Sequence, residues 1–209
     1  MTENKKENLN NRMIKFLFEG APVRGACVQM AEEWQEMIKF HHYPENVAAL
    51  LGQFTAGALL LSSTIKFEGS LILQVKGSGP IAFIYAEVRN PMSVRAMAEI
   101  REGAEIKPEM DLQELINKDG KGLCALILDP KDRRPGVQPY QGMVSLESNS
   151  VAENLENYMA KSEQLETKLY LAADCKKLGG LVIQKMPSVG GNVSEISDPD
   201  AWGRIMQLA

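Results

Sequence analysis

An uncharged apolar run, VAALLGQFTAGALLLSSTI at residues 47–65, constrains the fold more than any other feature of the sequence. A helix that crosses a bilayer needs about 20 such residues, so a membrane span is one interpretation of this run. Polar side chains such as Gln53 dilute its hydrophobicity, and no cluster of Lys or Arg flanks it to set an orientation. We therefore expect a buried apolar helix at residues 45–65, in the core of a large domain.

Small residues within the same run recur at four-residue steps, at Ala48, Gly52 and Ala56. Residues at this spacing lie on one side of a helix. They are expected to let another segment of backbone approach the helix closely.

The segments around the apolar run alternate between strand and helix patterns. Strands are predicted at 13–18, 23–30, 71–76, 81–88 and 93–100, an amphipathic helix at 31–40, and a short helix begun by an aspartate cap at 111–116. Residues 123–129 form a further apolar run that ends at Asp-Pro. These patterns predict an α+β fold in which a mixed, largely antiparallel β-sheet packs with several helices.

Residues 140–187 are predicted to form a strand, a helix, a strand, a turn and a final strand. Ser150 followed by Glu153 is a capping box, in which hydroxyl and carboxylate each satisfy a free backbone donor at the start of the helix. Gly179-Gly180 is predicted to be the turn between the last two strands. On pattern alone this segment is a well-formed core unit without chemistry.

Charge and cysteine content exclude several classes of function. A net charge of −4 and a pI near 5.4 argue against nucleic-acid binding by phosphate neutralisation. Cys27, Cys124 and Cys175 are far apart and form no C-x-x-C pair, so neither a disulfide framework nor a zinc finger is expected. A reducing, cytoplasmic compartment fits this usage, and the N-terminal residues contain no secretory signal.

Two short motifs keep an enzyme interpretation open. Gly77-x-Gly79 after a predicted strand fits a loose dinucleotide-binding fingerprint, but an alternating segment follows instead of a helix, so a hairpin turn is favoured. Ser63 and Lys66 have the S-x-x-K spacing of a serine–lysine hydrolase without its companion motifs. No catalytic, cofactor-binding or metal-binding residue is assigned from the sequence.

A set of residues between Tyr140 and Pro187 forms a recognisable signature. Its members are Tyr140, Gln141, Gly142, Glu147, Tyr158, Ser162, Glu163, Gln164, Gly179, Gly180, Met186 and Pro187. Leu146, Thr167 and Gln184 accompany them. Further matches are Arg24-Gly25, Tyr43-Pro44, the turn at residues 66–69 and Gly79-Pro80. With these residues the chain resembles the heat shock protein 33 family, redox-regulated bacterial holdases, over residues 13–187. We interpret all of these residues as structural, with Ser162-Glu163-Gln164 closing the C-terminal end of the helix.

The resemblance implies an ATP-independent chaperone that binds unfolding client proteins under oxidative and heat stress and forms a homodimer. It also implies a C-terminal domain whose cysteines hold zinc when reduced and form disulfides when oxidised. None of the three cysteines here matches a zinc ligand, so no cofactor is expected in this chain, and zinc is expected only in that further domain.

The resemblance divides the sequence into a disordered tail at 1–12, a chaperone core at 13–187 and a linker with a terminal helix at 188–209. We expect a truncation at the linker, in preference to a natural short form, and activity that needs no oxidant. The client-binding residues are unknown from the sequence. A hydrolase or nucleotide-binding protein, and a purely structural dimerisation domain, are the alternatives.

Overall fold

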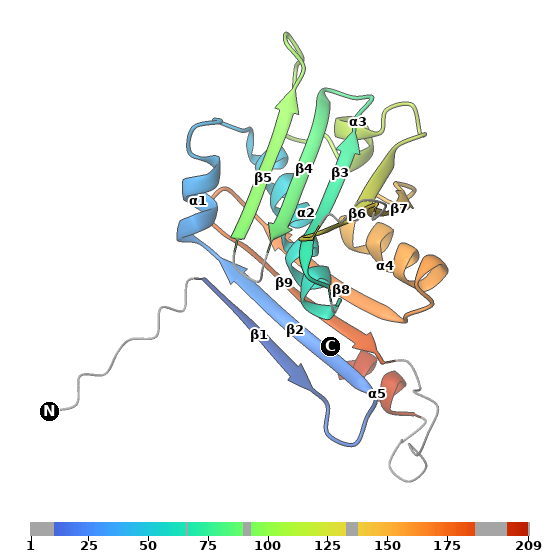
Figure 1. Ribbon diagram of the computed structural model, residues 1–209. Coiled ribbons are helices and arrows are strands. Elements are labelled where there is room, and N and C mark those ends of the chain that lie inside the picture. The colour runs from blue at the N-terminus through green and yellow to red at the C-terminus, as the bar shows by residue number, and fades with distance from the viewer. Residues whose placement is uncertain (1–10, 66, 90–92, 133–137, 187–199, 209) are drawn as a thin grey trace, which may run out of the picture.

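Two antiparallel sheets enclose helix α2 (Glu45–Thr64), as Figure 1 shows. The structure is a computed structural model that describes residues 11–65, 67–89, 93–132, 138–186 and 200–208. Most predicted elements are present, and the terminal helix lies at Ala201–Leu208 as expected. Lys66, Pro187 and most of the predicted linker lie outside the described residues.

The remaining elements follow one another in the predicted order. The other helices are α1 (Glu32–Ile38), α3 (Leu112–Ile116), α4 (Val151–Ser162) and α5 (Ala201–Leu208). The strands are β1 (Asn11–Leu17), β2 (Val23–Met30), β3 (Gly69–Lys76), β4 (Ile81–Arg89), β5 (Ser93–Ile100), β6 (Leu123–Pro130), β7 (Tyr140–Ser145), β8 (Thr167–Ala173) and β9 (Leu178–Lys185). Strand β1 begins at Asn11, within the segment expected to be a tail.

The strands form one four-stranded and one five-stranded sheet. Sheet A has the order β1-β2-β9-β8, and sheet B the order β5-β4-β3-β6-β7. Every pairing is antiparallel, which confirms the predicted fold class. The division into two sheets was not predicted, because it depends on the pairing of β2 with β9 across most of the chain.

Helix α2 is the core helix of the protein. It packs against strands of both sheets and against α4. By length and composition it could cross a membrane, but 78% of its most apolar window is buried inside the fold. The prediction of a buried apolar helix is confirmed, because two sheets and a helix supply the apolar surroundings that a bilayer would otherwise provide.

Glycines allow α2 to approach its neighbours closely. A Cβ atom at Gly52 would overlap the Cβ of Ala173 in β8 and lie 3.2 Å from the Trp34 ring. A Cβ at Gly180 in β9 would lie 2.9 Å from the Leu60 side chain of α2. The predicted close approach therefore occurs at Gly52, where sheet A meets the helix.

The predicted turn at Gly179-Gly180 is wrong. Both glycines lie inside β9, paired with Gln29 and Val28 of β2. The turn lies earlier, where the Asp174 carboxylate accepts hydrogen bonds from the N–H groups of Lys176 and Lys177. A glycine is needed at position 180 because α2 lies close to it, and not because the backbone bends there.

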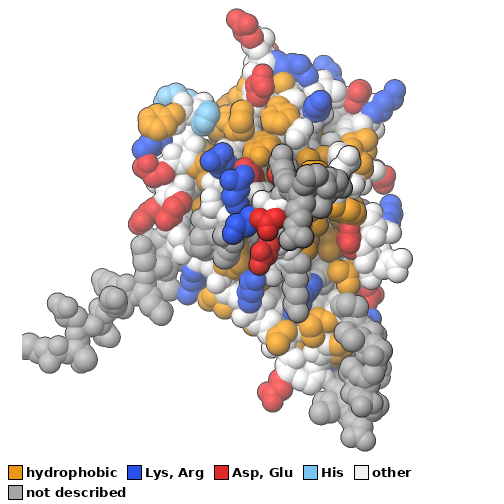
Figure 2. All heavy atoms as spheres, in the orientation of Figure 1, with side chains coloured by type: hydrophobic (Ala, Val, Ile, Leu, Met, Phe, Trp, Pro, Cys, Tyr) orange, Lys and Arg blue, Asp and Glu red, His pale blue; other side chains and the backbone are white. Residues whose placement is uncertain are grey.

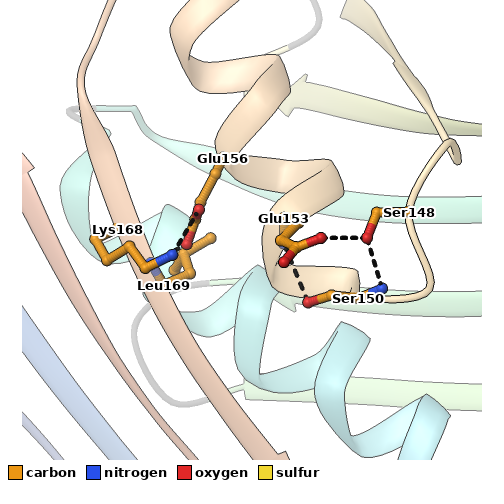
Figure 3. A network of polar contacts seen from close by, with 6 residues as sticks. All are labelled: Ser148, Ser150, Glu153, Glu156, Lys168 and Leu169. Atoms are coloured by element: carbon orange, nitrogen blue, oxygen red, sulfur yellow. Dashed lines mark hydrogen bonds and ion pairs between the residues drawn. The ribbon is translucent and has the colours of Figure 1, made fainter.

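The capping box at the start of α4 is only half as predicted (Figure 3). The Ser150 hydroxyl accepts a hydrogen bond from the Glu153 N–H at 3.3 Å, as expected. The Glu153 carboxylate does not return to the Ser150 N–H, which donates instead to the Ser148 hydroxyl at 3.0 Å. The Ser148 hydroxyl in turn donates a hydrogen bond to the Glu153 carboxylate, so it connects this carboxylate to the Ser150 N–H. The capping box at Asp111 and Glu114 of α3 is complete.

Replacement of Gly52 by Ala is expected to destabilise the protein, although alanine is the better helix former. The new methyl group would overlap Ala173, and overpacking of this kind costs about 1–3 kcal/mol. Chemical denaturation should give a lower free energy of unfolding for Gly52→Ala. Adding Ala173→Gly should recover part of the lost stability. If the double variant lost as much free energy of unfolding as the two single variants together, the result would contradict the contact between residues 52 and 173.

Candidate functional site

The outer face of sheet A, opposite α2, carries a row of apolar side chains across all four strands. The strand register places Ile14 beside Cys27, Cys27 beside Leu181, and Leu181 beside Tyr170. Directly paired residues of antiparallel strands share one face of the sheet, so these four side chains form a continuous line.

The side on which this row lies follows from Gly180. Its missing Cβ faces Leu60 of α2, so the next residue, Leu181, must point away from the helix. Val28, Val182 and Leu169, which flank the row along the strands, belong to the core on the α2 side. The row therefore lies on the outer surface of sheet A.

A second apolar row lies beside the first. The ring of Phe16 lies over Gly25, where any Cβ would overlap it. Ile183 is paired with Gly25 and is only 3% exposed. Helix α5 and the β1–β2 turn cover this end of the face, and a pocket of about 490 Å³ remains between Phe18, Ile183 and Ile205.

The outer face of sheet A combines apolar area with little fixed polarity. Ile14 is 43% and Tyr170 38% exposed, while Cys27 and Leu181 are half-buried. Charged side chains lie at the border of this face. Lys168 forms an ion pair with Glu156 at 3.1 Å, and Lys185 forms one with Glu166 at 2.6 Å. Such a face can hold apolar segments of another chain, and it brings together no acid, base and nucleophile for chemistry.

The outer face of sheet B differs, because charged side chains gather near the end of β4 and the start of β5, with hydrophobic side chains above them in Figure 2. Glu87 is buried there and accepts hydrogen bonds from Tyr85 at 3.0 Å and Arg89 at 3.2 Å. Burial, together with the nearby Glu87 carboxylate, raises the pKa of Tyr85 to about 12. The Arg89–Glu87 ion pair places charge on this part of the face.

Four of the signature residues form a cluster between β7 and α4. The Glu163 carboxylate accepts hydrogen bonds from the hydroxyls of Tyr140 at 3.1 Å and Tyr158 at 2.9 Å. The Tyr158 hydroxyl lies where a Cβ of residue 142 would be, so only Gly142 fits beneath it. Burial and the neighbouring Tyr140 and Glu163 raise the pKa of Tyr158 far above its usual value.

The end of α4 also contains the other residues of the Ser162-Glu163-Gln164 triplet. Ser162 is the last helical residue and Gln164 has a left-handed backbone with φ of 56°. Leu165 N–H then donates to the Met159 carbonyl at 3.0 Å, which closes the helix. The structural role of this triplet stays a prediction. Gln141 and Glu147 are exposed, and Met186 N–H donates to the Pro22 carbonyl.

Three residues that accompany the signature meet within sheet A. Gln184 is fully buried, accepts hydrogen bonds from the Arg24 guanidinium at 2.5 and 3.0 Å, and donates to Thr167 at 2.8 Å. Burial lowers the pKa of Arg24. This network fixes the register of β2, β9 and β8, and hence which side chains reach the outer face of the sheet.

The two enzyme motifs receive no support from the geometry. Residues 77–80 form the predicted hairpin turn, and the Ser78 N–H donates to Ile116 at the carboxyl end of α3, where an anion would be repelled. Arg101 donates to the carbonyls of Gly77 and Gly79. The Ser63 hydroxyl donates to the Leu60 carbonyl at 2.7 Å, while Lys66 lies outside the described residues.

The cysteines form no site within the described part of the chain. All three are free, and among the described residues no group of three or more His, Cys, Asp or Glu side chains could hold a metal ion. Burial raises the pKa of Cys124 to about 12. Cys175 is exposed in the β8–β9 turn, and partial burial with nearby Glu45 and Asp174 raises its pKa.

Comparison with known proteins gives one consistent family. The family model described as Hsp33 protein matches residues 11–208. The "33 kDa chaperonin" of Methylobacillus flagellatus is 37% identical over 202 residues, which cover 96% of this chain and 64% of the relative. The "33 kDa chaperonin" of Neisseria gonorrhoeae is 39% identical over 202 residues, 97% of this chain and 63% of the relative. The chain thus spans slightly less than two thirds of these relatives.

A solved structure with the same fold is the crystal structure of the 33 kDa chaperonin, or heat shock protein 33 homolog, of Thermotoga maritima. Its TM-score is 0.68 at 22% sequence identity, and the match covers 85% of this chain and 62% of that chain. At this identity the likeness bears on the fold alone.

Thiol labelling should separate the three cysteines. At pH 8 a thiol with a pKa of about 12 is almost entirely protonated, and protonated thiols alkylate slowly. We expect iodoacetamide to modify exposed Cys175 first and half-buried Cys27 next, with Cys124 protected until the protein is unfolded in guanidinium. Peptide mapping by mass spectrometry gives the order, and early modification of Cys124 would contradict its position in the core.

Proposed function

The chain belongs to the Hsp33 protein family, and from this premise we propose that residues 13–187 form the core of an ATP-independent chaperone, a holdase. It binds unfolding proteins during heat and oxidative stress and holds them without a chemical step. The names of the relatives support a chaperone function. The proposal that the chain acts as a holdase is supported by one apolar surface of the fold.

The observation that carries this proposal is the apolar outer face of sheet A. An unfolding client exposes side chains from its own core, and burying them stabilises the complex by about 25 cal/mol per Å² of apolar area. The row through Ile14, Cys27, Leu181 and Tyr170 offers such area without requiring a particular client sequence. Sequence patterns missed this surface, because its members become neighbours only through the register of four strands.

The other parts of the proposal concern partners, place and regulation. We propose that the chain forms a homodimer, acts in the cytoplasm and binds neither nucleic acid nor membranes. We further propose that these 209 residues hold clients without an oxidant, since no described cysteine has the surroundings of a zinc ligand. The hydrolase and nucleotide-binding alternatives are less favoured, because the Gly77 loop faces the carboxyl end of a helix and Ser63 bonds to its own helix.

Under reducing conditions the chain is expected to suppress the aggregation of an enzyme unfolded by heat, as measured by light scattering. Tyr170→Asp should weaken client affinity roughly tenfold, because it puts a charge into the apolar face and removes about 1–2 kcal/mol of apolar burial. Met97→Asp is the matched control, since Met97 is similarly exposed, at 40%, on β5 of the other sheet.

Equal loss of suppression in both variants would contradict the assignment of the surface. No suppression by the unaltered chain would contradict the holdase proposal itself. If that inactive chain were still dimeric, the structural dimerisation domain would become the better interpretation.

The oligomeric state can be measured directly. Sedimentation equilibrium at micromolar concentration should give twice the mass of the chain. A mass of one chain over the whole concentration range would contradict the proposed homodimer.

A further inference from the structure

The edges of the two sheets differ, and at two of the four edges a side chain occupies outward backbone groups. At the edge of β5, the Tyr43 hydroxyl accepts a hydrogen bond from the Ala98 N–H at 3.0 Å and donates to the Ala98 carbonyl at 2.9 Å. At the edge of β8, the Glu156 carboxylate accepts one from the Leu169 N–H at 2.7 Å (Figure 3). Strand β7, the other edge of sheet B, contacts α4 through its inner face, where the Tyr158 ring covers Gly142. At β5 and β8, these bonds occupy backbone groups that an added strand would need.

Strand β1 forms the edge of sheet A opposite β8. Phe18 N–H donates to the Val23 carbonyl, so alternate residues from Arg12 to Phe16 exchange bonds with β2. The backbone groups of Asn11, Met13, Lys15 and Leu17 therefore point away from β2. Among the described residues, these groups have no hydrogen-bond partner. Figure 1 shows β1 at the border of the molecule.

Lysine on an edge strand often prevents further pairing, but Lys15 is held elsewhere. Its ammonium donates to the Ser63 carbonyl at 2.9 Å, in the last turn of α2. There it satisfies a free carbonyl at the negative end of the helix. The side chain is thereby drawn towards α2, while the Lys15 backbone groups stay accessible.

We propose that the edge of β1 binds an extended segment of an unfolded client, which adds a fifth strand to sheet A. The inference rests on the proposed holdase function and deepens it. Backbone hydrogen bonds are independent of sequence, as a holdase requires, and alternate apolar side chains of the added strand would continue the row that starts at Ile14. Client binding thus combines an edge and a face of the same sheet.

The first test compares two forms of one peptide, a soluble fluorescein-labelled sequence in which valine alternates with threonine. In the second form, alternate amides are N-methylated so that one edge cannot donate. Fluorescence anisotropy should show at least about tenfold weaker binding of the methylated peptide, since several hydrogen bonds are lost. Equal affinities would overturn the proposal, and suppression of aggregation by the unaltered chain would still support the holdase function.

The second test alters the protein. Lys15→Pro removes one outward N–H, and Lys15→Ala is its reference because it loses the same side chain and keeps the amide. Lys15→Pro should bind the unmethylated peptide about fivefold more weakly than Lys15→Ala, and both should bind the methylated peptide alike. Circular dichroism shows whether both variants fold.

Amide exchange of the unaltered chain keeps the proposal testable if the proline variant does not fold. The amides of Met13, Lys15 and Leu17 should exchange rapidly in the free protein and about tenfold more slowly with saturating peptide. Unchanged exchange of these amides with bound peptide would overturn strand addition. Protection without peptide that grows with protein concentration would show that a second copy of the chain occupies this edge, and would also overturn it.

Discussion

The close packing of α2 between two sheets is the constraint on which the rest of the structure depends. The helix is apolar on all sides, so it is stable only if every side is covered. Gly52 and Gly180 let sheet A come near enough to cover it. Because the inner face of sheet A packs against this helix, the remaining apolar side chains of the sheet lie on the outer face, which is the proposed binding surface.

Polar residues of the signature and its neighbours form hydrogen-bond networks that connect these elements. Glu163 holds Tyr140 of β7 and Tyr158 of α4 together, and Gly142 makes room for the second hydroxyl. Gln184 joins the strands of sheet A in the same way through Arg24 and Thr167. Buried polar groups need fixed partners, so these networks set the relative positions of the elements. The proposed binding surface needs such a scaffold, because its shape depends on strand register.

The two errors of local interpretation have a common cause. Gly179-Gly180 has the composition of a turn, yet the glycines are required by the approach of Leu60 from α2. Ser150 and Glu153 have the spacing of a capping box, yet Ser148 from the preceding loop supplies the second acceptor. In both cases a residue outside the local pattern decides the outcome, and propensity describes only the residues within it.

The amino-acid sequence by itself determined the order and type of nearly all elements, the buried helix at 45–65 and the family resemblance. These features depend on periodicity, caps and turns, whose physical effects extend over a few residues. Only the tertiary structure decided that the strands divide into two sheets, that Ile14, Cys27, Leu181 and Tyr170 form one row, and that β1 is an edge strand. Each of these depends on pairing between residues far apart in the chain, and a shift of one residue would turn every side chain of a strand to the opposite face.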